Sequence, residues 1–425
     1  MHPVPGIVLH AARFWHRAVL AAALFFLTLS AAAAPLSLTE AESLLLRQNP
    51  ALAALAQKTA ELRHRAVAAG QLPDPRLSVD AVNLPADTLA LNRQQMTMLS
   101  LGVSQSFPPW GKRTLEGERA DMEARAAGAE RGARAADLIL TLRQAWFDAM
   151  YAVHARQIVE AQQGLAEQST QAALALYRAS QAPEADVLRA RLAQGELANE
   201  LSRLQAERQE ALARIAQILN LSEIPELDSR WPRPPVPPAL TQMIETLSAQ
   251  PALRAAQAQT RAAQLGVDVA RRDYYPEFTV RMGYGQSYYP GSPNWLSAGV
   301  ELSLPIFPGK RQDQNLAAAQ AQALQAQYDY DDKRLAFTRQ ARSVYARYSA
   351  LESQWQRTER ELLPTARSAY AATLAAYSAG RADMSAVLKV QQEVLDSGLA
   401  ALRYRRDLES ARAELDYLAA QGDAP

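Results

Sequence analysis

Cysteine is absent from the 425-residue chain, so the protein has no disulfide framework, no thiolate metal site and no cysteine nucleophile. A bacterial lipoprotein anchor requires a cysteine at the mature N-terminus, and we therefore expect no N-terminal lipid anchor. An excess of one charge is missing too, since the formal net charge is +1. The mixed charges are typical of solvated helix faces, and we expect no nucleic-acid partner.

Long apolar runs are scarce, and the one clear run lies near the N-terminus. Arg13, His16 and Arg17 precede the apolar stretch Ala18–Leu29, and small residues follow it. This order of charged, apolar and small residues is typical of a secretory signal. The apolar stretch is too short to cross about 30 Å of hydrocarbon comfortably. The pattern predicts a signal peptide over residues 1–33.

The rest of the chain contains one pattern twice, at an offset of about 200 residues. Residues 38–52 resemble residues 240–253, and residues 175–191 resemble residues 375–390. A proline-rich stretch between the copies is typical of a semi-rigid linker. The sequence therefore predicts a first repeat over 34–224, a linker over 225–238 and a second repeat over 239–425.

Helical patterns dominate each repeat. A first helix is predicted over Leu38–Gly70 in the first copy and over Leu240–Arg272 in the second. Far longer patterns follow, over Lys112–Ala182 and Lys310–Ala379, with Pro364 as the single proline in the second. At 1.5 Å per residue each would be roughly 100 Å long. A break and a shorter returning helix complete each copy.

Two alternating segments lie between these helices in each repeat, at 76–82 and 99–104 and again at 277–285 and 296–304. Apolar residues occupy one face of each segment and polar or small residues the other, which predicts strands. A length of about ten residues suits a tilted strand that crosses a membrane. A small soluble hairpin packed on a core would show the same alternation.

The second strand of each repeat ends in a shared junction motif. It reads "GVSQSFPPWGKR" at 102–113 and "GVELSLPIFPGKR" at 299–311. Prolines end the strand because proline cannot donate to the ladder. We expect glycine to permit a sharp turn and the basic residues to begin the long helix near anionic groups of a membrane surface. The junction residues are Gly111, Lys112, Arg113, Gly309, Lys310 and Arg311.

Four strands cannot close a barrel, and an open edge in lipid leaves backbone groups without hydrogen bonds. Copies of the chain must therefore pool their strands. A dimer would give eight strands, too few for an aqueous channel. The predicted fold is mostly α with a membrane β-barrel: a trimeric, 12-stranded barrel with four strands per chain. A long periplasmic α-helical barrel continues it, and each chain supplies two tandem repeats.

Together, the signal peptide, the helix–strand–strand–hairpin order and the duplication resemble the TolC-like outer-membrane efflux proteins. The resemblance covers essentially the whole mature chain. Residues 83–113 are similar to the heavy-metal branch, the outer-membrane partners of copper/silver and cobalt/zinc/cadmium exporters. Residues 375–388 are similar to the periplasmic tip turn of the family.

The resemblance implies a homotrimeric channel in the outer membrane of a Gram-negative bacterium, with a coiled-coil helical part in the periplasm. It implies outer-membrane lipid, a periplasmic adaptor protein and an inner-membrane RND pump as partners. It favours heavy-metal ions as the cargo, and drug efflux or type I protein secretion is the alternative. A different class, a periplasmic helical-hairpin adaptor, would carry one hairpin with compact β-domains. No catalytic constellation, cofactor motif or phosphate loop is found, so we expect no enzyme and no cofactor.

The turns after the long helices are predicted to form the periplasmic tips, with the gate and the adaptor contact. We expect apolar tip residues to pack hairpin against hairpin, and Arg178 or Arg381 to pair with Asp186 or Asp383. Lys389 and Ala386 stand where better-known members carry acidic residues. The expected tip residues are Tyr177, Arg178, Asp186, Val187, Leu188, Tyr377, Gly380, Arg381, Asp383, Val387, Leu388 and Lys389.

Two further features concern methionine and helix bending. Met96 and Met98 share the lumenal face of the second strand, where thioethers suit Cu(I), although they also suit simple filling of the barrel mouth. They are weak metal candidates, and we expect no resident metal. Gly164 aligns with Pro364, and both positions are expected to bend the long helices inward.

Overall fold

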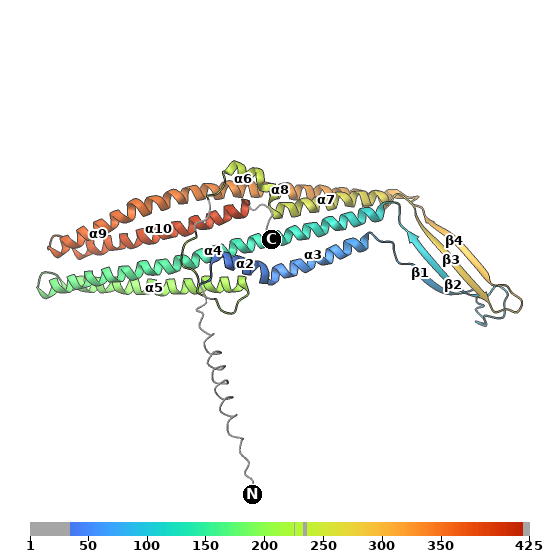
Figure 1. Ribbon diagram of the computed structural model, residues 1–425, viewed down its shortest axis with the longest axis horizontal. Helices are drawn as coiled ribbons and strands as arrows, with labels where there is room; N and C mark the ends of the chain where they lie inside the picture. The colour runs from blue at the N-terminus through green and yellow to red at the C-terminus, as the bar shows by residue number, and fades with distance from the viewer. Residues whose placement is uncertain (1–34, 225, 233–235, 420–425) are drawn as a thin grey trace, which may run out of the picture.

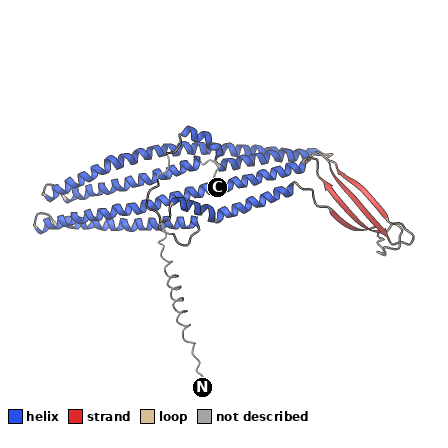
Figure 2. Ribbon diagram, in the orientation of Figure 1, coloured by secondary structure: helices blue, strands red, loops and turns tan. Residues whose placement is uncertain are grey.

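The computed structural model describes residues 35–224, 226–232 and 236–419. The predicted signal peptide, residues 1–33, lies outside the described residues. The molecule is elongated, with a four-stranded sheet at one end and two helical hairpin turns at the other (Figure 1). Helices fill the length between them, and the strands are confined to the sheet (Figure 2).

Both repeats follow the same order of elements. The first repeat consists of α2 (Leu38–Gln48), α3 (Pro50–Ala69), β1 (Arg76–Val82), β2 (Met98–Phe107), α4 (Lys112–Arg178) and α5 (Glu184–Leu219). The second consists of α6 (Leu240–Thr246), η1 (Leu247–Ala249), α7 (Pro251–Arg272), β3 (Glu277–Ser287), β4 (Trp295–Ser303), η2 (Pro308–Lys310), α8 (Gln312–Arg357), η3 (Thr358–Leu362), α9 (Leu363–Ser378) and α10 (Met384–Ala419). The predicted strands and long hairpins are confirmed.

The first helix of each repeat is broken, and the prediction of one continuous helix was wrong in both copies. Proline disfavours the helical conformation of the residue before it. Asn49, before Pro50, is extended, and its side chain accepts hydrogen bonds from the first amides of α3. Gln250, before Pro251, is also extended and caps α7 in the same way.

The long helices differ between the repeats at the positions where bends were expected. The second-repeat helix passes through a π-helical turn, η3, and Pro364 follows within the first turn of α9. In the first repeat, α4 remains α-helical through Gly164. Glycine keeps its amide donor and proline does not, so only the proline copy needs a local change of hydrogen bonding.

The sheet joins the two repeats. Its order is β1-β2-β3-β4, with antiparallel pairing throughout, so β2 of the first repeat pairs with β3 of the second. β1 and β4 are the edges, and each has a strand partner on one side only. Since strands pair through two sides, each edge carries a row of unpaired backbone groups.

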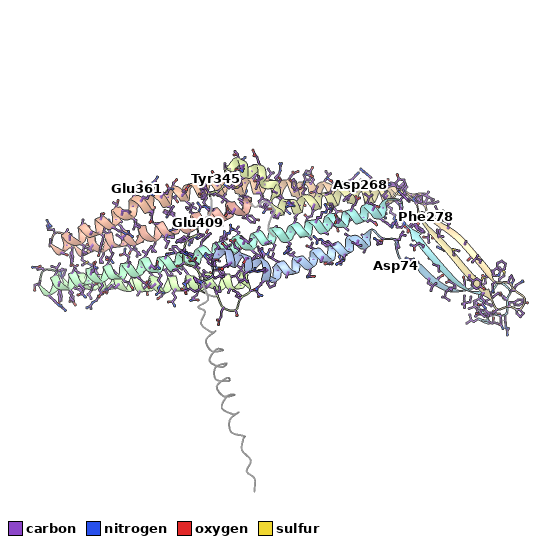
Figure 3. The ribbon with its side chains drawn as sticks, in the orientation of Figure 1. Asp74, Asp268, Phe278, Tyr345, Glu361 and Glu409 are labelled. Carbon is purple, nitrogen blue, oxygen red and sulfur yellow. The ribbon has the colours of Figure 1, made fainter. Side chains whose placement is uncertain are left out.

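The main core lies where the helices of both repeats pass one another. Trp146, Leu142 and Met150 of α4 are almost completely buried there, against α2 and the end of α5. A second cluster joins α8, α10 and α6 around Tyr348, and Figure 3 places Tyr345 and Glu409 in the same part of the molecule. Among the described helices, none is long and apolar enough to cross a membrane.

The described part of the linker is docked to the helices. Leu36 and Leu227 form a parallel bridge, with Leu36 N 2.7 Å from Glu226 O. Trp231 stacks on Phe147 and His154, and the Arg405 guanidinium lies 4.9 Å from the Trp231 ring centre. The linker therefore contributes side chains to the packing, although its composition indicated only a spacer.

We expect Asn49→Ala to lower the free energy of unfolding by about 1–2 kcal/mol, because it removes a helix cap and a buried hydrogen bond. Asn49 Nδ2 donates to Ile218 O at 2.9 Å, which ties the break between α2 and α3 to the end of α5. Thermal unfolding in detergent measures the change. Gln48→Ala, at the exposed neighbouring position, is the control, and equal stability of both variants would contradict this role.

Candidate functional site

The two faces of the sheet differ sharply. Register places the apolar side chains of all four strands on one face, for example Leu101 opposite Val79 and Tyr284, and Tyr284 opposite Leu296. These side chains are exposed, and Leu296 reaches 77%. An apolar face of this extent, left uncovered, indicates contact with lipid or protein.

The opposite face is polar and hollowed. A cavity of about 830 Å³ lies against it, lined mainly by serine, glycine and charged side chains of β1–β4. An ion pair between Arg281 and Glu301 crosses from β3 to β4. Small residues keep this face open, since a Cβ at Gly102 would stand 2.7 Å from Ser78 Oγ. The arrangement suits a water-filled passage beside the sheet.

Met98 lies on this polar face, as expected, and its sulfur packs over Gly285, where a Cβ would stand 2.5 Å away. Met96 precedes β2 and is exposed. Met98 therefore fills a gap left by glycine. Within residues 35–224, 226–232 and 236–419, no cluster of three or more His, Cys, Asp or Glu side chains is arranged to hold a metal ion.

The first junction turns as predicted, but its basic residues have protein partners. Gly111 adopts a φ of 77° and forms the N-cap of α4. Lys112 Nζ lies 2.7 Å from Asp273 Oδ1 at the end of α7, and Arg113 donates to Gly70 O at 3.4 Å. Both side chains contact the ends of neighbouring helices, and their contact with anionic groups of a membrane stays a prediction.

The second junction has another backbone conformation. Gly309 lies in the short 3₁₀ turn η2 after Pro308, without a positive φ. The expectation that Gly309 supplies a sharp turn was wrong, because Pro308 fixes its own φ and starts a helical turn instead. Lys310 and Arg311 are exposed, and neither forms an ion pair with another described residue.

Both tip turns close with the same hydrogen bonds. The amide of Gln181 donates to Leu176 O at 2.8 Å, and the amide of Arg381 donates to Ala376 O at 2.9 Å. The residue before each donor is left-handed, with φ of 56° at Ser180 and 66° at Gly380. This is the Schellman ending of a helix, which favours glycine. Only the second repeat has the favoured residue.

A tyrosine–carboxylate contact joins the two tips. Tyr377 Oη donates to Asp186 Oδ2 at 3.4 Å, across from the second hairpin to the first. Arg189 holds the other carboxylate oxygen at 3.3 Å. Burial and the neighbouring Asp186 raise the pKa of Tyr377, so the phenol stays protonated and remains a donor. The equivalent Tyr177 is 43% exposed, against 3% for Tyr377.

Apolar tip residues also pack between the hairpins. Val187 and Val387 are buried in one cluster with Tyr377 and Met384, and Leu388 packs against it. This confirms the expected hairpin-to-hairpin packing for three of the four residues. Leu188 is absent from this cluster and is 56% exposed in the single chain.

The expected arginine pairs of the tips do not form within one chain, and pairing between neighbouring chains stays a prediction. Asp186 pairs with Arg189, one helical turn away on α5, and not with Arg178 or Arg381. Within the part of the chain that the structure describes, Arg178, Arg381, Asp383 and Lys389 form no ion pair. The alignment of the repeats located the tip, but which charges meet depends on helix rotation and was not readable from spacing.

Comparison with known proteins finds similarity to one family over the second repeat and to one relative over most of the chain. The model of the family described as "Outer membrane efflux protein" matches residues 244–421. The cobalt-zinc-cadmium resistance protein CzcC of Cupriavidus metallidurans is 26% identical over 375 residues, which cover 88% of this chain and 86% of that protein. The resemblance inferred from the sequence, including that to the heavy-metal branch, is confirmed.

Solved structures confirm the fold. The outer-membrane channel OprN superposes with a TM-score of 0.78 and 21% identity over 90% of each chain. CusC gives 0.77 and 18% identity over 90% of this chain and 91% of that one. The outer membrane protein VceC of Vibrio cholerae gives 0.76 and 18% identity over 90% and 95%. The elements described above are therefore those of an outer-membrane channel fold.

We expect Ser180→Gly to stabilise the first tip by up to about 1 kcal/mol and Gly380→Ala to destabilise the second by about as much. Both effects follow from the left-handed φ, which costs a residue with a Cβ and costs glycine little. Hydrogen exchange of the tip amides, compared between the variants, measures local opening. Faster exchange in Ser180→Gly than in the unmodified protein would contradict the argument.

Proposed function

We propose that the whole chain forms the outer-membrane channel of a tripartite efflux system for heavy-metal ions. The match of residues 244–421 to the family described as "Outer membrane efflux protein" supports this proposal. The sheet lies in the outer membrane and the helical part extends through the periplasm. The family consists of transport channels rather than enzymes. We therefore propose that this chain lets its cargo pass and makes or breaks no covalent bond.

The observation that carries this proposal is the sheet, which has an uncovered apolar face and two unpaired edges. Backbone groups that face hydrocarbon without a partner cost several kcal/mol each. Pairing β4 of one chain with β1 of the next removes both edges. A homotrimer then gives a closed barrel of twelve strands, with the apolar face toward lipid and the polar face toward water.

The environments of the two tyrosines support the same assembly. The two repeats are equivalent in the proposed assembly. The second hairpin of a neighbouring chain would therefore contact Tyr177 in the way that the first hairpin of the same chain contacts Tyr377. Position 386 of that neighbour, equivalent to Asp186, is alanine. The joint within a chain thus has a tyrosine–carboxylate bond that the joint between chains lacks.

This difference suggests where the tip opens. The joint within a chain combines the Tyr377–Asp186 bond with the buried Val187 and Val387, whereas the joint between chains has only packing. We therefore place the gate at the joints between chains. A periplasmic adaptor binds the tips and separates them, and an inner-membrane RND pump supplies the cargo through the adaptor.

Heavy-metal ions are the cargo we favour, because the similarity to CzcC extends over 88% of the chain. Drugs or secreted proteins are the alternative cargo. A periplasmic adaptor role is disfavoured, since the chain carries two hairpins with two strands each. The polar face beside the strands suits hydrated ions, and Met98 offers them transient contact only.

The assembly and its function are tested together. The purified protein in mild detergent should have three times the protomer mass, and deletion of its gene should lower the tolerance of the cell to cobalt, zinc or cadmium. Leu296→Arg, on the apolar face, should reduce the amount in the outer membrane because an arginine in lipid costs about 2–4 kcal/mol.

Ser297→Arg, on the polar face of the same strand, is the matched control and should be tolerated. A monodisperse monomer would overturn the trimer. Unchanged metal tolerance together with increased drug sensitivity would instead assign the channel to drugs.

Lys389 is expected to lie at the constriction of the closed tips, where three-fold symmetry would bring three ammonium groups together and disfavour cations. Lys389→Asp should raise cation selectivity and resting conductance in planar bilayers. Lys333→Asp, which makes the same charge change at an exposed position of α8 away from the tip, is the control. Unchanged selectivity and conductance in Lys389→Asp would remove Lys389 from the gate.

A further inference from the structure

Two buried glutamines interrupt the apolar contact between the two hairpins. Gln162 of α4 is 4% exposed and Gln391 of α10 is 6% exposed. The apolar cluster around Tyr151 and Leu399 lies on their sheet side, and the cluster around Tyr377 lies at the tips. Within the described part of the chain, Oε1 of both glutamines has no hydrogen-bond donor. Buried acceptors without donors are costly, so the contact is weakened at this level.

Both hairpins carry helix-weakening features near these glutamines. In the second hairpin, the π-helical turn η3 and Pro364 interrupt the regular α-helical hydrogen bonds, and Glu361 in Figure 3 marks this turn. In the first hairpin, Gly164 lies inside α4 and Gly195 inside α5. A Cβ at either glycine would meet no other part of the described chain within 4 Å, so packing does not require glycine there. Glycine inside a helix makes it less stable than alanine does.

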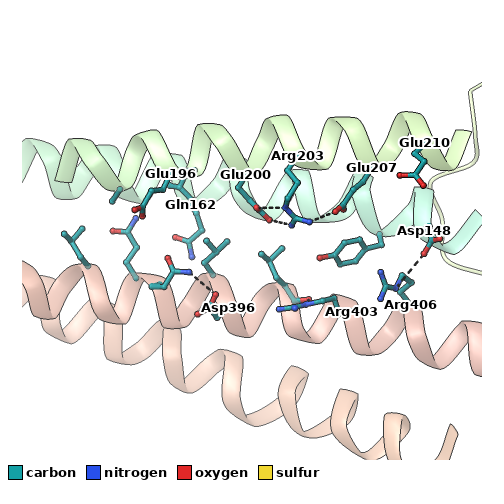
Figure 4. Close-up of a pocket in the computed structure, with 18 of the residues that line it drawn as sticks. Asp148, Gln162, Glu196, Glu200, Arg203, Glu207, Glu210, Asp396, Arg403 and Arg406 are labelled. Carbon is teal, nitrogen blue, oxygen red and sulfur yellow. Dashed lines mark hydrogen bonds and ion pairs between the residues drawn. The ribbon is translucent and has the colours of Figure 1, made fainter. Parts of the chain in front are cut away.

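Shared cavity walls place these features at one level of the molecule. Gln162 lines a cavity of about 570 Å³, and α5 lines the same cavity on either side of Gly195 (Figure 4). Gln162 also lines a second cavity of about 980 Å³, together with Leu363, the residue before Pro364. We call this level the waist and define it by Gln162, Gly164, Gly195, Pro364 and Gln391.

One close contact between the hairpins remains beside the waist. Gly398 of α10 lies against Ile158 of α4, where a Cβ would stand 3.3 Å from Cγ2 of the isoleucine. The two cavities lie on either side of the contact between α4 and α10, one bordered by α5 and the other by α9. Because space lies on both sides of this contact, the helices can tilt about it without losing it.

We propose that the waist is a hinge on which the tip ends of both hairpins of a chain swing together. The Tyr377–Asp186 bond and the apolar cluster at the tips hold the two hairpins to each other during this motion. Bending at the waist admits water, which donates hydrogen bonds to the amide oxygens of Gln162 and Gln391. The inference rests on the proposed channel, since the swing separates the tips of neighbouring chains and so opens the gate.

Spin-label distances test whether the two tips of a chain move together. The chain has no cysteine, so Ala179→Cys and Ala379→Cys, at exposed positions of the two tip turns, can be labelled selectively. With one doubly labelled chain per trimer, the distance between the two tips should have a narrow distribution. With Ala179→Cys in every chain, the distance between chains should have a broader one. Equal widths, or a broader distribution within a chain, would overturn the hinge.

A stiffer waist should reduce both the spread of distances between chains and the opening of the channel. Gly164→Ala with Gly195→Ala should lower the open fraction in planar bilayers about fivefold or more. The Tm should not fall, because alanine suits a helix and its Cβ has room at both positions. Gly266→Ala is the matched control, since its Cβ has equal room in α7, away from the waist, and it should change neither quantity.

A second pair of substitutions tests the contribution of the glutamines. Gln162→Leu with Gln391→Leu removes the two acceptors without donors and should also lower the open fraction, without lowering the Tm. An unchanged open fraction and an unchanged spread in both double variants would overturn the hinge and leave the channel intact. A monomer in mild detergent would instead overturn the proposed assembly, and the mass measurement shows this independently of the waist variants.

Discussion

The structure depends first on the need to pair backbone groups at the two edges of its sheet. Four strands per chain leave β1 and β4 open, and the apolar face across them is uncovered. In lipid neither condition is tolerable for a single chain, because no water replaces the missing hydrogen bonds. Copies of the chain must therefore associate through these edges. The rest of the molecule, including the long helices that leave the sheet at the two junctions, must be compatible with this association.

Because each chain carries two similar repeats, a trimer would have nearly six-fold symmetry. The two repeats nevertheless differ in sequence at the junctions and at the tips. The first junction uses a left-handed Gly111 and the second a 3₁₀ turn at Pro308. Asp186 bonds to Tyr377 within the chain, whereas the equivalent of Asp186 is Ala386. The contact between the two hairpins of a chain therefore includes a tyrosine–carboxylate bond that the equivalent positions of the other repeat cannot form.

Prediction from the sequence succeeded where the signal is local and repeated. Alternation indicated the four strands, the lack of proline indicated the long helices, and the break after each long helix indicated the tip turns. It failed at Pro50 and Pro251, where an apolar pattern at helical spacing continued across a proline that ends one helix and starts another. Within one chain it did not locate Leu188 or the partners of Arg178 and Arg381, because these contacts depend on the rotation of one hairpin against another.

The sequence by itself determined the duplication, the order of helices and strands and the sheet faces, since each follows from periodicity or from residues close together in the chain. Only the tertiary structure decided which residues meet across the repeats: Tyr377 with Asp186, Lys112 with Asp273, Trp231 with Arg405, and Gln162 with Gln391 around one cavity. These residues lie tens to hundreds of positions apart, and a rotation of about 100° separates successive residues on a helix. Small differences in helix phase therefore select the partners, and no local pattern records that phase.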